Sequence, residues 1–152
     1  MTPEKLEYFR QLLLKKKEEI LKRVFEQEHI IKQLKEEGYE IPEERDDYAR
    51  IDYNELILGE LEDVEIEILR EIDKALERIA NGTYGYCEVC GNPIEEKRLE
   101  AIPWTTLCVK HAQEAERYKL TPDQMYKDYL EESLIPYYEP LEEDVKEEGL
   151  DK

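Results

Sequence analysis

The sequence has little of what several common protein classes require. No apolar run approaches the roughly 20 residues that a membrane-spanning helix needs, and the start of the chain is charged within five residues, unlike a secretory signal. Only 3 cysteines, 2 phenylalanines and 1 tryptophan occur among the 152 residues. An odd number of clustered cysteines does not suit a disulfide framework. We therefore expect a cytoplasmic protein with no membrane partner.

Basic residues are also scarce, and they are not clustered as nucleic-acid binding requires. Lys and Arg number 22 against 40 Asp and Glu, a formal net charge of −18. Residues 36–80 alone carry seventeen acidic and five basic side chains, whereas a DNA-binding surface needs Lys and Arg that displace counterions from phosphates. We interpret the one basic run, Lys15-Lys16-Lys17, as the solvated face of a helix. We expect no direct nucleic-acid binding and a preference for basic protein partners.

Apolar residues recur at helical spacing in two long segments. Residues 3–37 and residues 52–80 carry an apolar side chain every three, four or seven positions, with charged residues between them. This is the period of an amphipathic or coiled-coil helix, and each uninterrupted helix would be on the order of 45 Å long. Neither stripe can be buried alone, so the simplest arrangement is an antiparallel hairpin in which each helix covers the other. Two parallel helices from different chains are the alternative.

The cysteines indicate a metal site. Two residues separate Cys87 from Cys90, seventeen residues follow, and two residues again separate Cys108 from His111. A tight turn with two residues between ligands lets both side chains reach one ion, and three thiolates with one imidazole complete the tetrahedral coordination of structural zinc. We therefore predict one structural Zn²⁺, bound by Cys87, Cys90, Cys108 and His111.

Three other interpretations of the same residues are weaker. A thioredoxin-like redox pair follows a β-strand, and no strand pattern precedes Cys87. A catalytic zinc ion usually has three protein ligands and an open position. Buried, inert cysteines would have no reason to share this spacing with a histidine.

Together these patterns predict an all-α fold with a long antiparallel coiled-coil hairpin, a small zinc finger and a C-terminal helix. We assign residues 1–80 to the hairpin, with its tip at about 38–51, and residues 81–119 to the finger and the start of the C-terminal helix. Residues 120–152 are expected to form a short helix to about residue 134, opened by a capping box at Thr121, and then an acidic, disordered tail. We expect a monomer.

Residues 82–108, GTYGYCEVCGNPIEEKRLEAIPWTTLC, resemble the zinc-finger signature of the DksA/TraR family of bacterial transcription factors. The resemblance lies in the aromatic-Gly-Tyr-Cys start, the Cys-Gly pair, the Arg-Leu-Glu-Ala segment and the third cysteine. The long helical hairpin upstream fits the coiled coil of that family. The resemblance implies a protein that is not an enzyme and that binds RNA polymerase by inserting its hairpin through the secondary channel toward the catalytic centre.

The resemblance also implies which residues lie at the tip. Counting back from Cys87 without a gap places Glu44, Asp47 and Ala49 on the tip motif of the family, with Glu44 in place of the usual Asp. The Asp47 carboxylate would then act near the magnesium ion of polymerase, and Ala49 would permit close packing. An acidic, solvated loop with no special role is the alternative.

Two further expectations complete the functional prediction. The basic residues through which some family members bind ppGpp fall on Val64, Glu71 and Ala112, none of which is basic, so a dependence on ppGpp is doubtful. The runner-up function is a zinc-containing coiled-coil adaptor, or a stress or sporulation accessory protein, that does not enter RNA polymerase. A third reading, a nucleic-acid-binding finger, conflicts with the net charge of −1 over residues 81–112.

Overall fold

The computed structural model describes residues 1–119, 121–122 and 124–125. These residues divide into two compact units. The first comprises Met1–Tyr84 and Lys97–Thr105, and the second comprises Gly85–Glu96 and the described residues from Thr106 onward. Residues 97–105, which the sequence assigns to the finger, therefore group with the hairpin.

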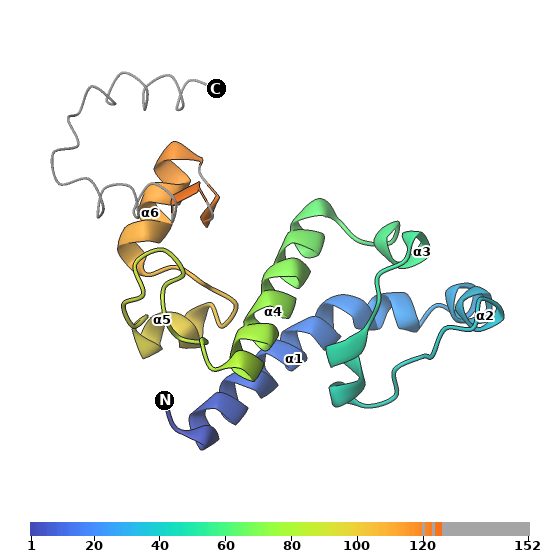
Figure 1. Ribbon diagram of the computed structural model, residues 1–152. Coiled ribbons are helices and arrows are strands. Elements are labelled where there is room, and N and C mark those ends of the chain that lie inside the picture. Colours follow the sequence, from blue (N-terminus) through green and yellow to red (C-terminus); the bar gives the residue numbers. More distant parts are fainter. Residues whose placement is uncertain (120, 123, 126–152) are drawn as a thin grey trace, which may run out of the picture. The chain divides into compact units, whose positions relative to one another are not determined.

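Helices dominate the described part of the chain (Figure 1). Within it no strand forms beyond an isolated bridge between Tyr86 and Pro93, so the predicted all-α class is confirmed. No helix there is long and apolar enough to cross a membrane. The Thr121 capping box is present, because Thr121 and Gln124 exchange backbone-to-side-chain hydrogen bonds. The helix predicted to about residue 134 and the acidic tail lie outside the described residues.

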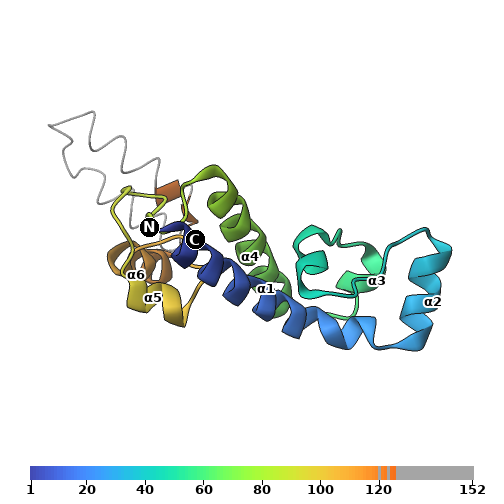
Figure 2. The same cartoon turned by 90° about the horizontal axis from the view of Figure 1, so that it is seen from below.

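Helices α1 (Pro3–Phe25) and α4 (Asp63–Asn81) pack on each other in the first unit (Figures 1 and 2). Lys17 pairs with Asp73 and Arg23 pairs with Glu65, so the two helices run antiparallel within one chain. Their facing stripes supply most of the core: Phe9, Leu13, Leu14, Ile20, Leu21 and Val24 from α1, and Leu69, Ile72 and Ala75 from α4. The predicted antiparallel hairpin is confirmed.

The first predicted helix is interrupted. The chain leaves the helix after Phe25 and resumes as α2 (Glu28–Glu36), with Gln27 in an extended conformation between them. Figure 2 shows α2 turning away from the axis of α1. Ile30 and Leu34 are nevertheless buried, so the apolar stripe continues across the break although the helix does not. The prediction of one unbroken helix over residues 3–37 is therefore wrong.

The second predicted helix is also interrupted. A single turn, α3 (Glu55–Leu58), is capped by the Asn54 side chain, whose Oδ1 accepts the N–H of Ile57 at 2.9 Å. Helix α4 then begins anew at a capping box, in which the side chains of Glu62 and Glu65 bond each other's backbone N–H groups. Because these caps satisfy the free N–H groups of two separate helices, the prediction of one helix over residues 52–80 is wrong.

Between α2 and α3 lies a 3-10 helix, η1 (Arg45–Arg50), which packs beside α1. Tyr48 is only 7% exposed, and its ring lies edge-on to that of Phe25 at 6.2 Å between centroids. The sequence assigns this segment to the tip at 38–51, whereas the structure places η1 along α1. The apolar ring of Tyr48 explains the difference, because it gains burial there.

The last two described helices belong to the zinc-finger sequence. Helix α5 (Glu96–Ala101) stands between the two cysteine-containing pairs, and α6 (Val109–Tyr118) begins at the second pair. Within the first unit, the hydroxyl of Tyr8 on α1 donates to Glu100 Oε2 at 2.7 Å, and the hydroxyl of Tyr84 donates to the Pro103 carbonyl at 2.8 Å. These bonds attach the segment around α5 to the hairpin.

Candidate functional site

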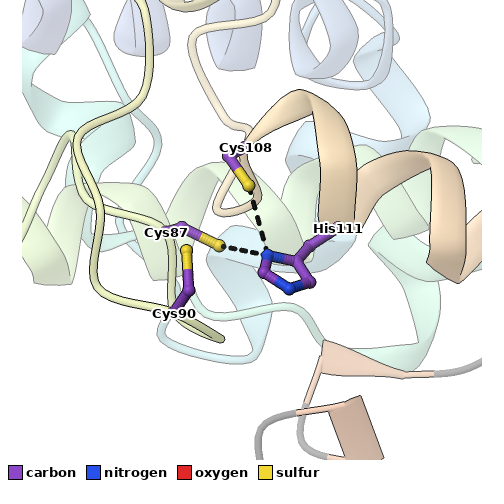
Figure 3. A group of neighbouring side chains, drawn as sticks. All are labelled: Cys87, Cys90, Cys108 and His111. Atoms are coloured by element: carbon purple, nitrogen blue, oxygen red, sulfur yellow. Dashed lines mark hydrogen bonds between the residues drawn. The ribbon is translucent and has the colours of Figure 1, made fainter. Parts of the chain in front are cut away.

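Cys87 and Cys90 lie on a tight turn of the second unit. The N–H of Gly91 donates to the Cys87 carbonyl, and the N–H of Cys87 donates to the Asn92 carbonyl, each at 2.8 Å. Gly91 has a φ of 76°, a left-handed conformation that glycine adopts without a steric penalty. The closed turn directs both thiols toward one point (Figure 3).

Cys108 and His111 come from the start of α6. Cys108 is the N-cap residue, and its carbonyl accepts the N–H of Ala112 at 2.8 Å. His111 follows in the first turn, where a spacing of three residues puts two side chains on one face. Cys87 and His111 are buried, and the other two cysteines are half-buried.

The four side chains fit one zinc ion. Their ligand atoms all lie within 4.8 Å of one another, and His111 Nδ1 is 3.2 Å from Cys108 Sγ and 3.6 Å from Cys87 Sγ (Figure 3). Tetrahedral zinc, with Zn–S near 2.3 Å and Zn–N near 2.0 Å, places sulfur and nitrogen about 3.5 Å apart. The two observed sulfur–nitrogen distances lie close to this value, so the cluster can hold a zinc ion with four protein ligands.

The surroundings of the thiols also suit a cation. Burial acts to raise the pKa of the Cys87 thiol, but backbone N–H groups of Cys108, Cys90 and Val89 donate to its sulfur, and its pKa is lowered overall. Burial raises the pKa of Cys108, and the adjacent Cys87 and Cys90 raise it further. Three thiolates so close together repel one another, and a divalent cation between them removes that repulsion.

The three predicted tip residues all lie at η1. Glu44 is its N-cap, and Asp47 Oδ2 accepts the backbone N–H groups of Glu44 at 2.8 Å and Glu43 at 2.9 Å. These hydrogen bonds lower the pKa of Asp47, so its carboxylate is ionised at neutral pH. Glu44 and Asp47 are exposed, and Ala49 is half-buried.

Sequence reasoning missed a buried ion pair inside the hairpin. Lys17 is 1% exposed, its Nζ lies 2.6 Å from Asp73 Oδ1, and it also lies 5.4 Å from the centre of the Tyr53 ring. The interpretation of the Lys15-Lys16-Lys17 run as a solvated face is therefore wrong for Lys17. A signal was available, because Lys17 stands four residues after Leu13 and three before Ile20, in phase with the buried stripe.

Comparison with known proteins places this architecture in a family. Residues 82–117 match the family model described as the prokaryotic dksA/traR C4-type zinc finger. An uncharacterised protein of Aquifex aeolicus is 50% identical over 117 residues, which cover 77% of this chain and 80% of that protein. The RNA polymerase-binding transcription factor DksA of Caulobacter vibrioides is 37% identical over 117 residues, with the same coverage.

A solved structure agrees with these matches. The RNA polymerase binding protein and transcriptional regulator Dks of Chlamydia trachomatis is 26% identical, with a TM-score of 0.50 over 80% of this chain and 98% of that chain. The finger match and the four-residue cluster together show that the chain binds structural zinc, with histidine at position 111 where a C4-type finger has cysteine. The chain belongs to the DksA/TraR family of zinc-finger proteins.

Proposed function

We propose that this protein is a transcription regulator that acts by binding RNA polymerase. The observation that carries the proposal is the 37% identity to the polymerase-binding factor of Caulobacter over 117 residues. The finger match occupies only residues 82–117, so the similarity must include much of the hairpin as well. A relationship confined to the finger would have supported zinc binding and little more.

In this proposal the hairpin enters the secondary channel of polymerase and brings acidic residues toward its catalytic centre. Helix α1 has 23 residues, a length of about 35 Å, and its packing on α4 keeps it stiff. Glu44, Asp47 and Ala49 are the residues proposed to contact polymerase. Asp47 is suited to act on a magnesium-bound centre because backbone hydrogen bonds stabilise its ionised form.

Cys87, Cys90, Cys108 and His111 are the proposed ligands of the zinc ion. Zinc bound there links the turn at residues 87–91 to the start of α6 and supplies folding free energy to the finger. Four protein ligands leave no position for a reactive water. We therefore propose a structural ion in a protein that is not an enzyme.

The proposed partner is polymerase itself, in the cytoplasm, without direct binding to nucleic acid. The chain has a formal net charge of −18, and a surface of that sign is repelled by phosphates. Val64, Glu71 and Ala112 offer no cation for ppGpp. Dependence on that nucleotide is therefore not part of the proposal.

The test is Asp47→Asn, examined by capture of core RNA polymerase and by transcription with purified components. Asparagine keeps an oxygen that can accept the N–H groups of Glu43 and Glu44, so η1 is retained while the charge is lost. We expect polymerase capture equal to that of the wild type and at least about a tenfold loss of the effect on responsive promoters, equivalent to ~1.4 kcal/mol. Zinc content is measured on the same samples.

Glu67→Gln is the matched control, because it removes one carboxylate from an exposed position on α4. It should leave both capture and transcription unchanged. If the wild type captures no polymerase, the adaptor function becomes the better description. An Asp47→Asn protein that regulates as strongly as the wild type would remove the acidic residue from the mechanism.

A further inference from the structure

We propose that the segment from Glu44 to Tyr53, here called the connector strap, is an autoinhibitory element. It holds the segment that carries Glu44, Asp47 and Ala49 beside α1, with Ala49 half-buried, and detachment frees this segment to reach into another protein. What these residues contact rests on the proposed function. The closed state of the strap rests on the structure alone.

Two ion pairs join the strap to α1. Arg45 Nη2 lies 3.3 Å from Glu18 Oε1, and Arg10 Nη1 lies 3.5 Å from Asp46 Oδ1. All four side chains are partly exposed, and an ion pair in such a setting changes an equilibrium by about fivefold or less. The ionic contacts are therefore specific enough to fix the position of η1 and weak enough to be released.

Two tyrosines supply the apolar contacts. Tyr48 is buried with its ring against Phe25, and the ring of Tyr53 lies over the ammonium group of Lys17. Tyr48 stands between Asp47 and Ala49 in the chain. While its ring is seated, both neighbours are held beside α1, and the half-buried Ala49 is not free to pack on another protein.

Release of the strap does not require the hairpin to open. The hydrogen bonds of Asp47 all run to its own loop, so none of them joins the strap to α1. The chain between α2 and α3, residues 37–54, reaches at most about 60 Å when extended. From these residues, Tyr48 adds a buried ring beside Phe25 and Tyr53 contacts Lys17, whereas the apolar stripes of α1 and α4 pack on each other.

The test uses charge reversal of one ion pair from both sides. Arg45→Glu and Glu18→Arg change the net charge in opposite directions, yet each places like charges 3.3 Å apart and should loosen the strap. The double variant restores the attraction. If only charge steered the encounter with polymerase, the two single variants would have opposite effects, whereas release of the strap predicts the same effect from both.

Two readouts are needed. Amide hydrogen exchange at Asp47 and Ile51, whose N–H groups bond within η1, should quicken about threefold to tenfold in each single variant. Affinity for core polymerase should rise by the same factor, because binding requires the open fraction. The double variant should return both values toward the wild type. Amides of α1 and α4 should not change, which confirms that the hairpin is intact.

The matched controls are Arg70→Glu and Glu67→Arg, which reverse the charges of an exposed pair within α4 and should alter neither readout. Quicker exchange with unchanged or weaker polymerase binding would overturn the autoinhibitory role. Wild-type amides at Asp47 and Ile51 without protection would overturn the closed strap itself. If no variant binds polymerase while the amides still respond, the proposed function and the autoinhibitory role both fail, and the closed strap stands.

Discussion

The hairpin and the finger are stabilised by different interactions. The hairpin buries an apolar stripe from each of two long helices, with one ion pair set into it. The described part of the finger unit buries only the side chains of Val89, Ile94 and Met125 besides those of the metal-binding pair Cys87 and His111. Burial of three apolar side chains contributes on the order of 5–9 kcal/mol, which the conformational entropy of ordering such a segment readily offsets.

This contrast indicates that the metal carries the stability of one region and hardly affects the other. Both helices of the hairpin bring their own caps: Thr2 Oγ1 accepts the N–H of Lys5 at 3.1 Å at the start of α1, and Glu62 forms the capping box at the start of α4. The turn at residues 87–91 is closed by backbone hydrogen bonds rather than by a capped helix. The predictions below test this difference between a hairpin stabilised by helix packing and a finger stabilised by zinc.

Removal of zinc should have the largest effect. A structural zinc ion contributes an apparent ~10–16 kcal/mol to the folding of zinc-finger peptides at neutral pH, so a chelator should unfold the second unit. Hydrogen exchange should show loss of protection at the backbone N–H groups of Cys87, Gly91 and Ala112, while the amides of α1 and α4 keep theirs. Re-addition of one equivalent of Zn²⁺ should restore the pattern. Loss of protection throughout the chain would show that the hairpin depends on the metal as well.

The buried ion pair of the hairpin should give the next largest effect, and it should be asymmetric. Asp73→Ala leaves the ammonium of Lys17 buried without a counter-ion, which costs up to ~3–5 kcal/mol of stability when a buried pair is broken. Asp73 is 37% exposed in its side chain, so Lys17→Met leaves a carboxylate that water can reach and should cost less than half as much. Denaturant unfolding of the zinc-bound protein measures both.

The double variant completes this comparison. Lys17→Met with Asp73→Ala removes both charges and should recover most of the stability lost by Asp73→Ala alone. Equal losses from the two single variants would mean that the pair behaves as a surface salt bridge. In that case burial of the Lys17–Asp73 pair would add nothing to the stability of the hairpin.

The burial of Lys17 also illustrates what the sequence can and cannot predict about the fold. The two apolar stripes follow from periodicity, because they depend on residues close together in the chain, and the antiparallel pairing follows from the need of each stripe to be covered. The helix breaks do not. Gln27 has no strong breaking tendency, and the break leaves Ile30 and Leu34 in phase for burial, so the stripe looks continuous in sequence. Periodicity reports which side chains are buried rather than whether the helix is unbroken.

The candidate functional residues also include some whose position the sequence predicts and some whose position it does not. The ligand cluster could be predicted from the sequence, because a spacing of two residues within each pair encodes a local turn or a helix start. The position of η1 could not. It depends on contacts of Arg45 with Glu18 and of Tyr48 with Phe25, which join residues more than twenty positions apart and have no periodic signal. The family resemblance implied that Glu44, Asp47 and Ala49 lie at the tip of the hairpin, whereas the structure places them at η1 beside α1.

The smallest effect is expected for His111→Cys, which converts the cluster to the four-cysteine set of the family model. The zinc–thiolate and zinc–imidazole bond lengths differ by only about 0.3 Å. Position 111 lies in the first turn of α6, next to the three cysteines. We expect one bound Zn²⁺ and a thermal midpoint within a few degrees of the wild type, equivalent to about 1 kcal/mol or less.

His111→Ala is the contrasting variant, because it removes a ligand and should weaken zinc binding by more than about 100-fold, beyond the usual loss for an outer-shell partner. If His111→Ala retained zinc as tightly as His111→Cys, the imidazole would not be a ligand, and the stability of the finger would rest on the three thiolates alone.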